Sequence, residues 1–374
     1  MAVKEPTREE PIRMTLPGAA YHSVETYEID RERVFFRNWL YVGRTERVPR
    51  PGSWLRADIA GESLLIVRGH DEQLRGFYNV CRHRGSQLCD GQQGEVRTHL
   101  RCPYHAWGYA LDGKLAITPL IEPDEIDREN RSLWPVHVEV WEGFVFVNLS
   151  REEPQPLREA LGSQEEDILA MARVGLGELR IGHVSTVDVQ ANWKIVLENY
   201  NECLHCPTVH PELVAVVPAY RKGSVVETGR EDGGVTLADG RTTVAADPRL
   251  RLPLLPGNRG RDDVSAYFGG MIYPTMFLDV DGAAALATAV HPTGPQSCRL
   301  VTEYLFSPDA FDDPTFDPTP VVDFNDLVTR QDNEVCERVQ RGVTSRAFDH
   351  GVFPAKDSFV YELDQRYLRD VGGD

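Results

Sequence analysis

The chain has 374 residues, of which 41% are hydrophobic, and a formal net charge of −18 at pH 7. This length suffices for two or three domains, and the acidic balance argues against a nucleic-acid-binding protein, because phosphates are bound by clusters of lysine and arginine. No apolar run approaches the ~18 residues of a membrane span, and the polar N-terminus does not resemble a secretion signal. The seven cysteines, an odd number, favour a reducing cytoplasm in which they serve as ligands or small buried side chains.

The first 41 residues predict a packed segment and not a free tail. Asp30 is placed to cap a short helix that carries Val34, Phe35, Trp39 and Leu40.

Residues 42–152 read as an all-β module of short strands and tight turns. Alternating apolar residues flank turn sequences such as Asp112-Gly113 and Glu142-Gly143, which are typical of β-hairpins. The hairpins are expected to pair residues 64–67 with 74–78, 108–111 with 114–117, and 136–140 with 144–146.

Residues 153–374 mix helices and strands. The region 214–265 is rich in Gly, Pro, Arg and Asp and predicts a long irregular excursion, of the kind that often covers a binding site. Helices are expected from Pro154 to about residue 174, at 319–343 and at 358–371, and strands at 180–190, 275–280, 284–291 and 299–306.

The β module carries two Cys/His pairs, each expected on a loop after a strand. Cys81 and His83 form the first pair, and Cys102 and His105 form the second, eighteen residues further along. Two thiolates and two imidazoles suit either tetrahedral zinc or a Rieske [2Fe–2S] centre, in which two histidines replace two cysteines on one iron. The β context, the short Cys-x-His spacing and the lack of a following recognition helix favour the Rieske cluster.

Four neighbours of these pairs are candidates to adjust the reduction potential of the cluster through hydrogen bonds and burial: Arg82, Arg84, Tyr104 and Trp107. Cys89 and His99, which lie between the pairs, have no role in this interpretation.

A second metal motif lies in residues 192–211. Asn192 is a good N-cap for an amphipathic helix, and Pro207 is expected to end that helix and bend the chain. The bend is needed because His205 and His210 would point about 140° apart on a straight helix. Two histidines supply two of the three ligands in the 2-His-1-carboxylate site of non-haem iron. Capping or surface histidines are the alternative.

Cys203-x-x-Cys206 overlaps this motif. It suggests zinc or a redox-active thiol, but no second such pair completes a four-cysteine site.

The third iron ligand is expected on the helix over residues 319–343. Asp332 lies on its apolar stripe, four residues after Val328 and three before Val335, whereas Asp323 and Asp326 lie elsewhere. An acid on a buried stripe needs a partner or a metal, so Asp332 is predicted to complete the iron site. A buried salt bridge is the alternative.

With both motifs in view, the chain resembles the large (α) subunit of Rieske-type non-haem iron oxygenases. The matching text is CRHRGSQLC with CPYHAWGYALDGKL, then NWKIVLENYNECLHCPTVHP and QDNEVCERVQRG. The resemblance implies an α+β chain with three parts: an N-terminal segment over 1–41 that packs on the catalytic domain, a Rieske [2Fe–2S] domain over 42–152, and a START-like helix-grip catalytic domain over 153–374. By motif position, Cys81, His83, Cys102 and His105 look like the cluster ligands, and His205, His210 and Asp332 like the Fe(II) ligands.

The resemblance also implies partners. Glu202 matches the acid that bridges a cluster histidine of a neighbouring subunit to an iron histidine, in a head-to-tail homotrimer. Electrons are expected from a separate flavin and iron–sulfur reductase that uses NADH or NADPH, and O2 is the co-substrate.

Glutamate at the bridging position makes the chain look most like the branch that acts on quaternary ammonium compounds. A pocket for such a cation should offer aromatic faces, and Tyr267, Phe268, Tyr273 and Phe277 are candidates, with plain hydrophobic core as the alternative. Three arginines in the excursion suit instead the carboxylate of an aromatic acid, the second substrate class: Arg221, Arg241 and Arg251. Two non-enzyme functions remain to be separated by metal content: an electron carrier with a vestigial second site, and a zinc-stabilised scaffold.

Overall fold

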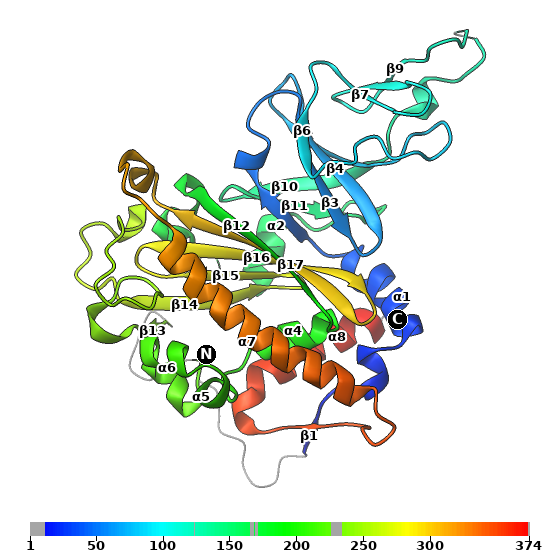
Figure 1. The fold of residues 1–374 in the computed structure, drawn as a ribbon. Helices are drawn as coiled ribbons and strands as arrows, with labels where there is room; N and C mark the ends of the chain where they lie inside the picture. The colour runs from blue at the N-terminus through cyan, green and yellow to red at the C-terminus, as the bar shows by residue number, and fades with distance from the viewer. Residues whose placement is uncertain (1–11, 123, 165–167, 169–170, 226–233, 373–374) are drawn as a thin grey trace. The chain divides into compact units, whose positions relative to one another are not determined.

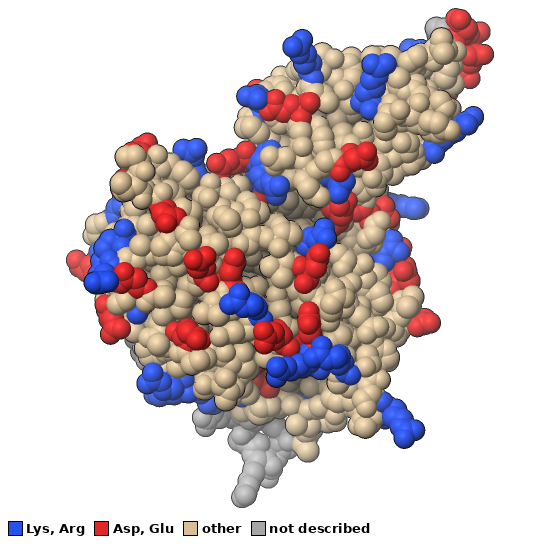
Figure 2. All heavy atoms as spheres, viewed as in Figure 1, with Lys and Arg blue, Asp and Glu red and all other residues tan. Residues whose placement is uncertain are grey.

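The computed structural model describes residues 12–372 except 123, 165–167, 169–170 and 226–233. The chain divides into two compact units: Phe35–Ala160 forms one, and Met1–Val34 with Leu161–Asp374 forms the other. No helix among the described residues is both long and apolar enough to cross a membrane. On the face seen in Figure 2, acidic and basic side chains are interspersed.

The first unit is built mainly from β-strands, as the sequence predicted, and the strands form two antiparallel sheets. The larger sheet has the order β2-β11-β10-β5-β4-β3-β6 and the smaller one β7-β8-β9. Their strands are β2 Leu40–Arg44, β3 Ser53–Ile59, β4 Glu62–Arg68, β5 Leu74–Tyr78, β6 Gln93–Glu95, β7 His99–Arg101, β8 Gly108–Ala110, β9 Leu115–Ile117, β10 Pro135–Trp141 and β11 Phe144–Asn148.

The three predicted hairpins are confirmed in this unit: β4 pairs with β5, β8 with β9 and β10 with β11. Gly113 and Gly143 have φ of +85° and +78° in their turns, a backbone conformation that glycine adopts without steric cost. The helix α2, Leu157–Gln164, follows β11. The predicted continuation of that helix toward residue 174 falls partly outside the described residues, and Ala172–Val174 forms a 3-10 turn.

The second unit is organised around a six-stranded antiparallel sheet of order β12-β17-β16-β15-β14-β13, with the long helix α7 lying across one face (Figure 1). The strands are β12 Arg180–Val189, β13 Val235–Thr236, β14 Ala266–Ile272, β15 Met276–Val280, β16 Ala284–Gly294 and β17 Ser297–Phe306. The helices are α1 Val24–Asp30, α4 Trp193–Tyr200, α5 Cys206–Val209, α6 Pro211–Val216, α7 Thr319–Val343 and α8 Ser358–Gly372, and β1 Arg13–Met14 pairs with β18 Val352–Phe353. This confirms the predicted α+β, helix-grip arrangement.

Polar contacts fix α7 on the sheet. Asp326 accepts hydrogen bonds from Ser185 on β12 and Tyr304 on β17, at 3.1 and 2.8 Å. The predicted apolar stripe is buried at Val321 and Phe324, whereas Val339 is 43% exposed. The stripe prediction is therefore wrong at Val339. In the second half of α7 the buried residues are Cys336, Gln340 and Val343.

Asp30 does not cap a helix, contrary to the prediction. It is the last residue of α1, whose N-cap is Ser23, and it is fully buried. Its carboxylate accepts hydrogen bonds from Lys194 at 2.5 Å, Trp193 at 2.9 Å and Tyr367 at 2.8 Å. Because a buried carboxylate needs such partners, Asp30 joins the N-terminal segment to α4 and α8.

The helix that begins at Asn192 ends earlier than predicted. The Asn192 side chain accepts a hydrogen bond from the backbone N–H of Lys194, which confirms the N-cap, but α4 stops at Tyr200. Asn201 follows, and its side chain donates to the carbonyl of Leu197 at 2.7 Å, satisfying one of the open carbonyls at the helix end. Pro207 lies in the first turn of the separate helix α5, where a missing N–H costs nothing. The chain therefore turns over residues 201–205 and not at Pro207.

Candidate metal centres and cavity

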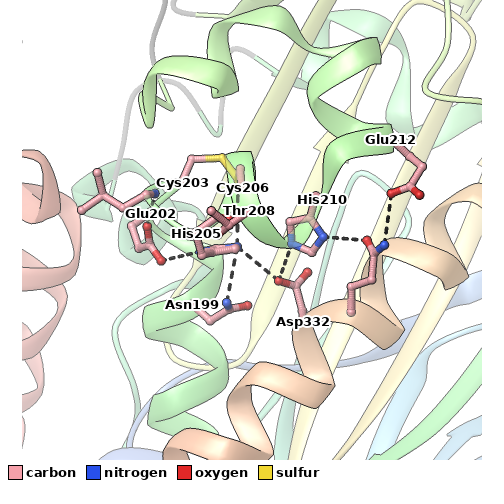
Figure 3. Close-up of polar contacts among 11 residues, drawn as sticks. Asn199, Glu202, Cys203, His205, Cys206, Thr208, His210, Glu212 and Asp332 are labelled. Atoms are coloured by element: carbon pink, nitrogen blue, oxygen red, sulfur yellow. Dashed lines mark hydrogen bonds and ion pairs between the residues drawn. A yellow bond between two sulfur atoms is a disulfide. The ribbon is translucent and has the colours of Figure 1, made fainter.

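The candidate iron ligands meet at one point although they come from different elements (Figure 3). His205 precedes α5, His210 joins α5 to α6, and Asp332 lies near the middle of α7. Asp332 Oδ1 lies 2.8 Å from His210 Nε2 and 3.3 Å from His205 Nε2. One ligand atom from each residue lies within 4.8 Å of the others, which is close enough to hold a single metal ion.

The other ring nitrogen of each histidine is held by a side-chain acceptor. His205 Nδ1 lies 2.5 Å from Glu202 Oε1, and His210 Nδ1 lies 2.8 Å from Gln331 Oε1. Gln331 is held in turn by Glu212, 3.1 Å away. These acceptors require the proton on Nδ1, so the lone pair of each Nε2 faces the common point.

The three groups also stabilise one another's charged forms. Burial alone would lower the pKa of His205, but the hydrogen bonds to Asp332 and Glu202 raise it to about 9. Burial favours a neutral Asp332, but the two histidines hold its pKa below the usual value. Asp332 therefore favours a cation, either a proton or a metal ion, at the two Nε2 atoms. When a metal ion replaces the proton, the donor set of two imidazoles and one carboxylate suits Fe(II) with open positions.

Cys203 and Cys206 form a disulfide on the loop that carries His205. This overturns the zinc interpretation of the pair. The disulfide packs against Val214 beside the candidate iron site and fixes the turn between Glu202 and α5.

In the first unit, the two Cys/His pairs also come together at the ends of strands. Cys81 follows β5 and Cys102 follows β7, and both side chains are buried. The rings of His83 and His105 lie 4.6 Å apart, and both are partly exposed. Buried thiols next to more exposed imidazoles match the unequal ligation of the two irons of a Rieske cluster.

The surroundings of these residues fit a bound cluster. His83 Nδ1 is buried and has no hydrogen-bond partner among the described residues, as expected for an atom that binds a metal. Burial raises the pKa of the Cys102 thiol, but the backbone N–H groups of Tyr104 and His105 outweigh it, so the pKa is lowered overall and the thiolate is favoured.

Two aromatic residues support the pairs. Trp107 stacks on His83 with ring centroids 4.7 Å apart. Tyr109, which the sequence interpretation missed, lies 3.4 Å from Cys81 Sγ and accepts a hydrogen bond from the backbone of Arg82. Its place on β8, two residues after Trp107, is the signal that could have suggested it.

A cavity of about 160 Å³ adjoins the candidate iron site and is lined by His205, His210 and Asp332. A second cavity, of about 190 Å³, shares part of its lining with the first. Of the four predicted aromatic residues, Tyr267 lines both, Phe277 the first and Phe268 the second, whereas Tyr273 is buried and lines neither.

The three arginines suggested as a carboxylate clamp line neither cavity among the described residues. Arg241 donates to the carbonyls of Ala245 and Ala246, and Arg251 to those of Pro248 and Leu250. The structure therefore gives no support to that clamp.

Comparison with known proteins identifies the class. Residues 176–373 match the model of the ring hydroxylating alpha subunit (catalytic domain), and residues 38–138 match the Rieske [2Fe-2S] domain. The chain belongs to this family of Rieske oxygenase α subunits, as the sequence motifs predicted.

Individual relatives lie in one branch of that family. The chain is 29% identical over 368 residues to the glycine betaine monooxygenase oxygenase subunit of Chromohalobacter salexigens, covering 91% of this chain and 81% of that protein. It is also 29% identical over 338 residues to the carnitine monooxygenase oxygenase subunit of Escherichia coli, covering 89% and 85%.

Solved structures show the same fold. The chain superimposes on the quaternary ammonium Rieske monooxygenase CntA with a TM-score of 0.79 at 24% identity, covering 99% of both chains. It superimposes on naphthalene 1,2-dioxygenase from Rhodococcus with a TM-score of 0.74 at 17% identity, covering 96% of this chain and 94% of that one.

Proposed function

We propose that this oxygenase oxidatively demethylates or hydroxylates a small quaternary ammonium compound of the betaine, carnitine or choline kind. The observation that carries the proposal is the convergence of His205, His210 and Asp332 on one point in the lining of a cavity. The names of the relatives, which act on glycine betaine or carnitine, support the substrate class. The arginine clamp suggested for an aromatic carboxylate, the second candidate, has no support, because Arg241 and Arg251 donate to backbone carbonyls.

In this proposal His205 Nε2, His210 Nε2 and Asp332 hold one Fe(II), and Cys81, His83, Cys102 and His105 hold the [2Fe–2S] cluster. When bound, the iron activates O2 beside the substrate and the cluster supplies electrons one at a time. Glu202 and Gln331 keep the two iron histidines in one tautomer and one orientation through their Nδ1 atoms. The cavity holds the substrate methyl group beside this site.

The overall reaction balances with two electrons from outside. An N-methyl group, O2, two electrons and two protons give an N-hydroxymethyl group and one water. The N-hydroxymethyl compound then loses formaldehyde and a proton, leaving the demethylated amine.

The electrons would come from a separate NADH- or NADPH-dependent reductase containing flavin and an iron–sulfur centre. We propose a cytoplasmic homotrimer, or stacked trimers, in which Glu202 links His205 to the cluster histidine of a neighbouring subunit. The partial exposure of the Glu202 side chain, 19%, supports this role, because its carboxylate can still accept a hydrogen bond from outside the chain.

The test is to supply the protein with a reductase, NADH and O2 and to offer betaines, carnitine, choline and benzoates. We expect formaldehyde in proportion to demethylated amine from at least one quaternary ammonium compound, and none with the Asp332→Ala variant. Hydroxylated benzoate without formaldehyde from any ammonium compound would refute the proposed substrate class.

A further inference from the structure

A single carboxylate, that of Asp279 on β15, lies where the two cavities share their lining. The shared residues are Tyr200, Tyr220, Val225, Tyr267 and Asp279. We call the cavity beside the candidate iron site the inner cavity and the other one the outer cavity. Of the three acids that line the inner cavity, Glu202 and Asp332 form hydrogen bonds with the iron histidines. Asp279 is the third, and the site described above gives it no task.

The carboxylate is held by two phenols on one side. Tyr200 and Tyr267 donate hydrogen bonds to Oδ1, at 2.8 and 2.7 Å. Within the described part of the chain, no side chain donates to Oδ2, which leaves this oxygen for a ligand. Burial raises the pKa of Asp279 to about 6, which still leaves the group mainly ionised at neutral pH.

The basic side chains among the described residues of the inner cavity are His205 and His210, which face Asp332. Among the described residues that line the inner cavity there is no lysine and no arginine. The described basic residues of the outer cavity, Arg173 and Arg261, are both exposed. An ionised carboxylate in such a place is stabilised by any cation that enters the cavity.

Aromatic rings surround the same place. Tyr200 stacks on Phe277 with ring centroids 3.8 Å apart, and Tyr220 meets Tyr267 edge-on at 6.4 Å. The faces of aromatic rings attract cations, most strongly those, such as quaternary ammonium groups, that are weakly hydrated. A carboxylate with several rings, in a lining without lysine or arginine among the described residues, is the chemistry that recognises an alkylammonium group.

We propose that Asp279 is the counter-ion for the substrate's quaternary ammonium group, held between the rings of Tyr200, Tyr220 and Tyr267. This inference rests on the proposed function, because it assigns the residues that select a cation for the same iron site. Asp279 would act on binding and selectivity and not on O2 activation. The alternative is that Asp279 only holds the two tyrosines in place.

The experiment compares probes of equal shape and different charge. Glycine betaine and 3,3-dimethylbutanoate share a carboxylate and a group of three methyls, but only glycine betaine carries the cationic nitrogen. Calorimetry on the iron-loaded holoenzyme measures the dissociation constant of each. Asp279→Asn removes the charge and keeps the shape and an acceptor for the tyrosines. Asp323→Asn, an exposed site on α7 that lines neither cavity, removes the same charge elsewhere.

The wild type should bind glycine betaine more tightly than 3,3-dimethylbutanoate, which lacks the cationic nitrogen. Asp279→Asn should weaken glycine betaine about 30-fold and bind 3,3-dimethylbutanoate no more weakly than the wild type does, since only the ionic attraction to the cationic nitrogen is lost. Asp323→Asn should behave as the wild type. Iron content and the cluster spectrum should be the same in all three proteins.

Three outcomes would overturn the inference. In the first, Asp279→Asn still binds glycine betaine more tightly than the other probe. In the second, Asp279→Asn weakens both probes equally, which would assign Asp279 a structural role. A wild type that binds neither probe more tightly than the other also overturns it. The proposed function is judged separately, by formaldehyde release from the wild type. A wild type that demethylates an ammonium compound while Asp279→Asn keeps its selectivity would refute this inference alone.

Discussion

The two candidate metal centres are assembled in opposite ways. In the first unit the four cluster residues lie between Cys81 and His105, on two loops of one β module. In the second unit Asp332 reaches His210 across 122 residues of sequence, from a different helix. The cluster ligands can therefore be recognised in one short stretch of sequence. The iron ligands come together only when the whole second unit has folded.

The histidines differ in a second respect. Among the described residues His83 Nδ1 has no partner, whereas the Nδ1 atoms of His205 and His210 each have a side-chain acceptor. We infer that His83 offers Nδ1 to its metal and that the iron histidines offer Nε2. The second unit therefore depends on supporting residues, and substitutions there are the means to test the difference.

Glu202→Ala should have the largest effect among these substitutions. It removes the acceptor from His205 Nδ1 and the proposed bridge to the neighbouring subunit. Turnover should fall below about one hundredth of the wild-type rate, with both metals retained. Turnover and iron content are measured on the same preparation, with Glu202→Gln as the control that keeps an acceptor. Appreciable activity in Glu202→Ala would refute the bridging role.

Gln331→Leu should have a smaller effect on the same centre. His210 Nδ1 loses its acceptor, so the ring is free to rotate and the iron should bind about tenfold more weakly. Iron retention is followed during titration with a chelator, while the cluster absorbance serves as the internal reference. The exposed neighbour Arg330→Ala should keep wild-type retention. Equal retention in Gln331→Leu would show that Gln331 does not support the iron site.

Asp364→Asn should have a modest effect, on stability and not on the metals. Asp364 is buried on α8, its Oδ2 has no hydrogen-bond partner among the described residues, and burial raises its pKa to about 7. Because the folded chain then holds this proton more tightly than the unfolded chain, wild-type stability falls as pH rises from about 4 to about 7. The variant should be more stable than the wild type at pH 8, by about 2 kcal/mol, and similar at pH 4.5.

Denaturant unfolding of the full chain at pH 4.5 and pH 8 measures this difference. Glu362→Gln, an exposed acid on the same helix, should show no such pH dependence relative to wild type. An Asp364→Asn variant that is less stable than wild type at pH 8 would mean that the buried carboxylate contributes a favourable contact there.

Much of the fold could be predicted because its signals are local. The bounds of α7 match the prediction, since the helix shows a long 3.6-residue period, and the hairpin turns carry Gly113 and Gly143. Contacts between distant segments could not be predicted. Asp30 was expected to cap a helix, but Lys194, far along the chain, holds it in the core.

The site was predicted in its residues and not in its local geometry. The two histidines were expected on either side of a bend at Pro207, but the chain turns earlier, where Asn201 satisfies the end of α4. Gln331 and Asp279 were missed because their roles depend on which side chains face them across the fold. The Cys203–Cys206 disulfide was not predicted, because the sequence shows their spacing but not their pairing.

The proposed oxygenase needs two separate iron centres in one chain, and metal analysis of the wild type beside Asp332→Ala is the decisive experiment. We predict about three irons per wild-type chain and about two in the variant, with the same Rieske spectrum in both. An Asp332→Ala protein that keeps its third iron, or a wild type that contains zinc in place of iron, would contradict the account.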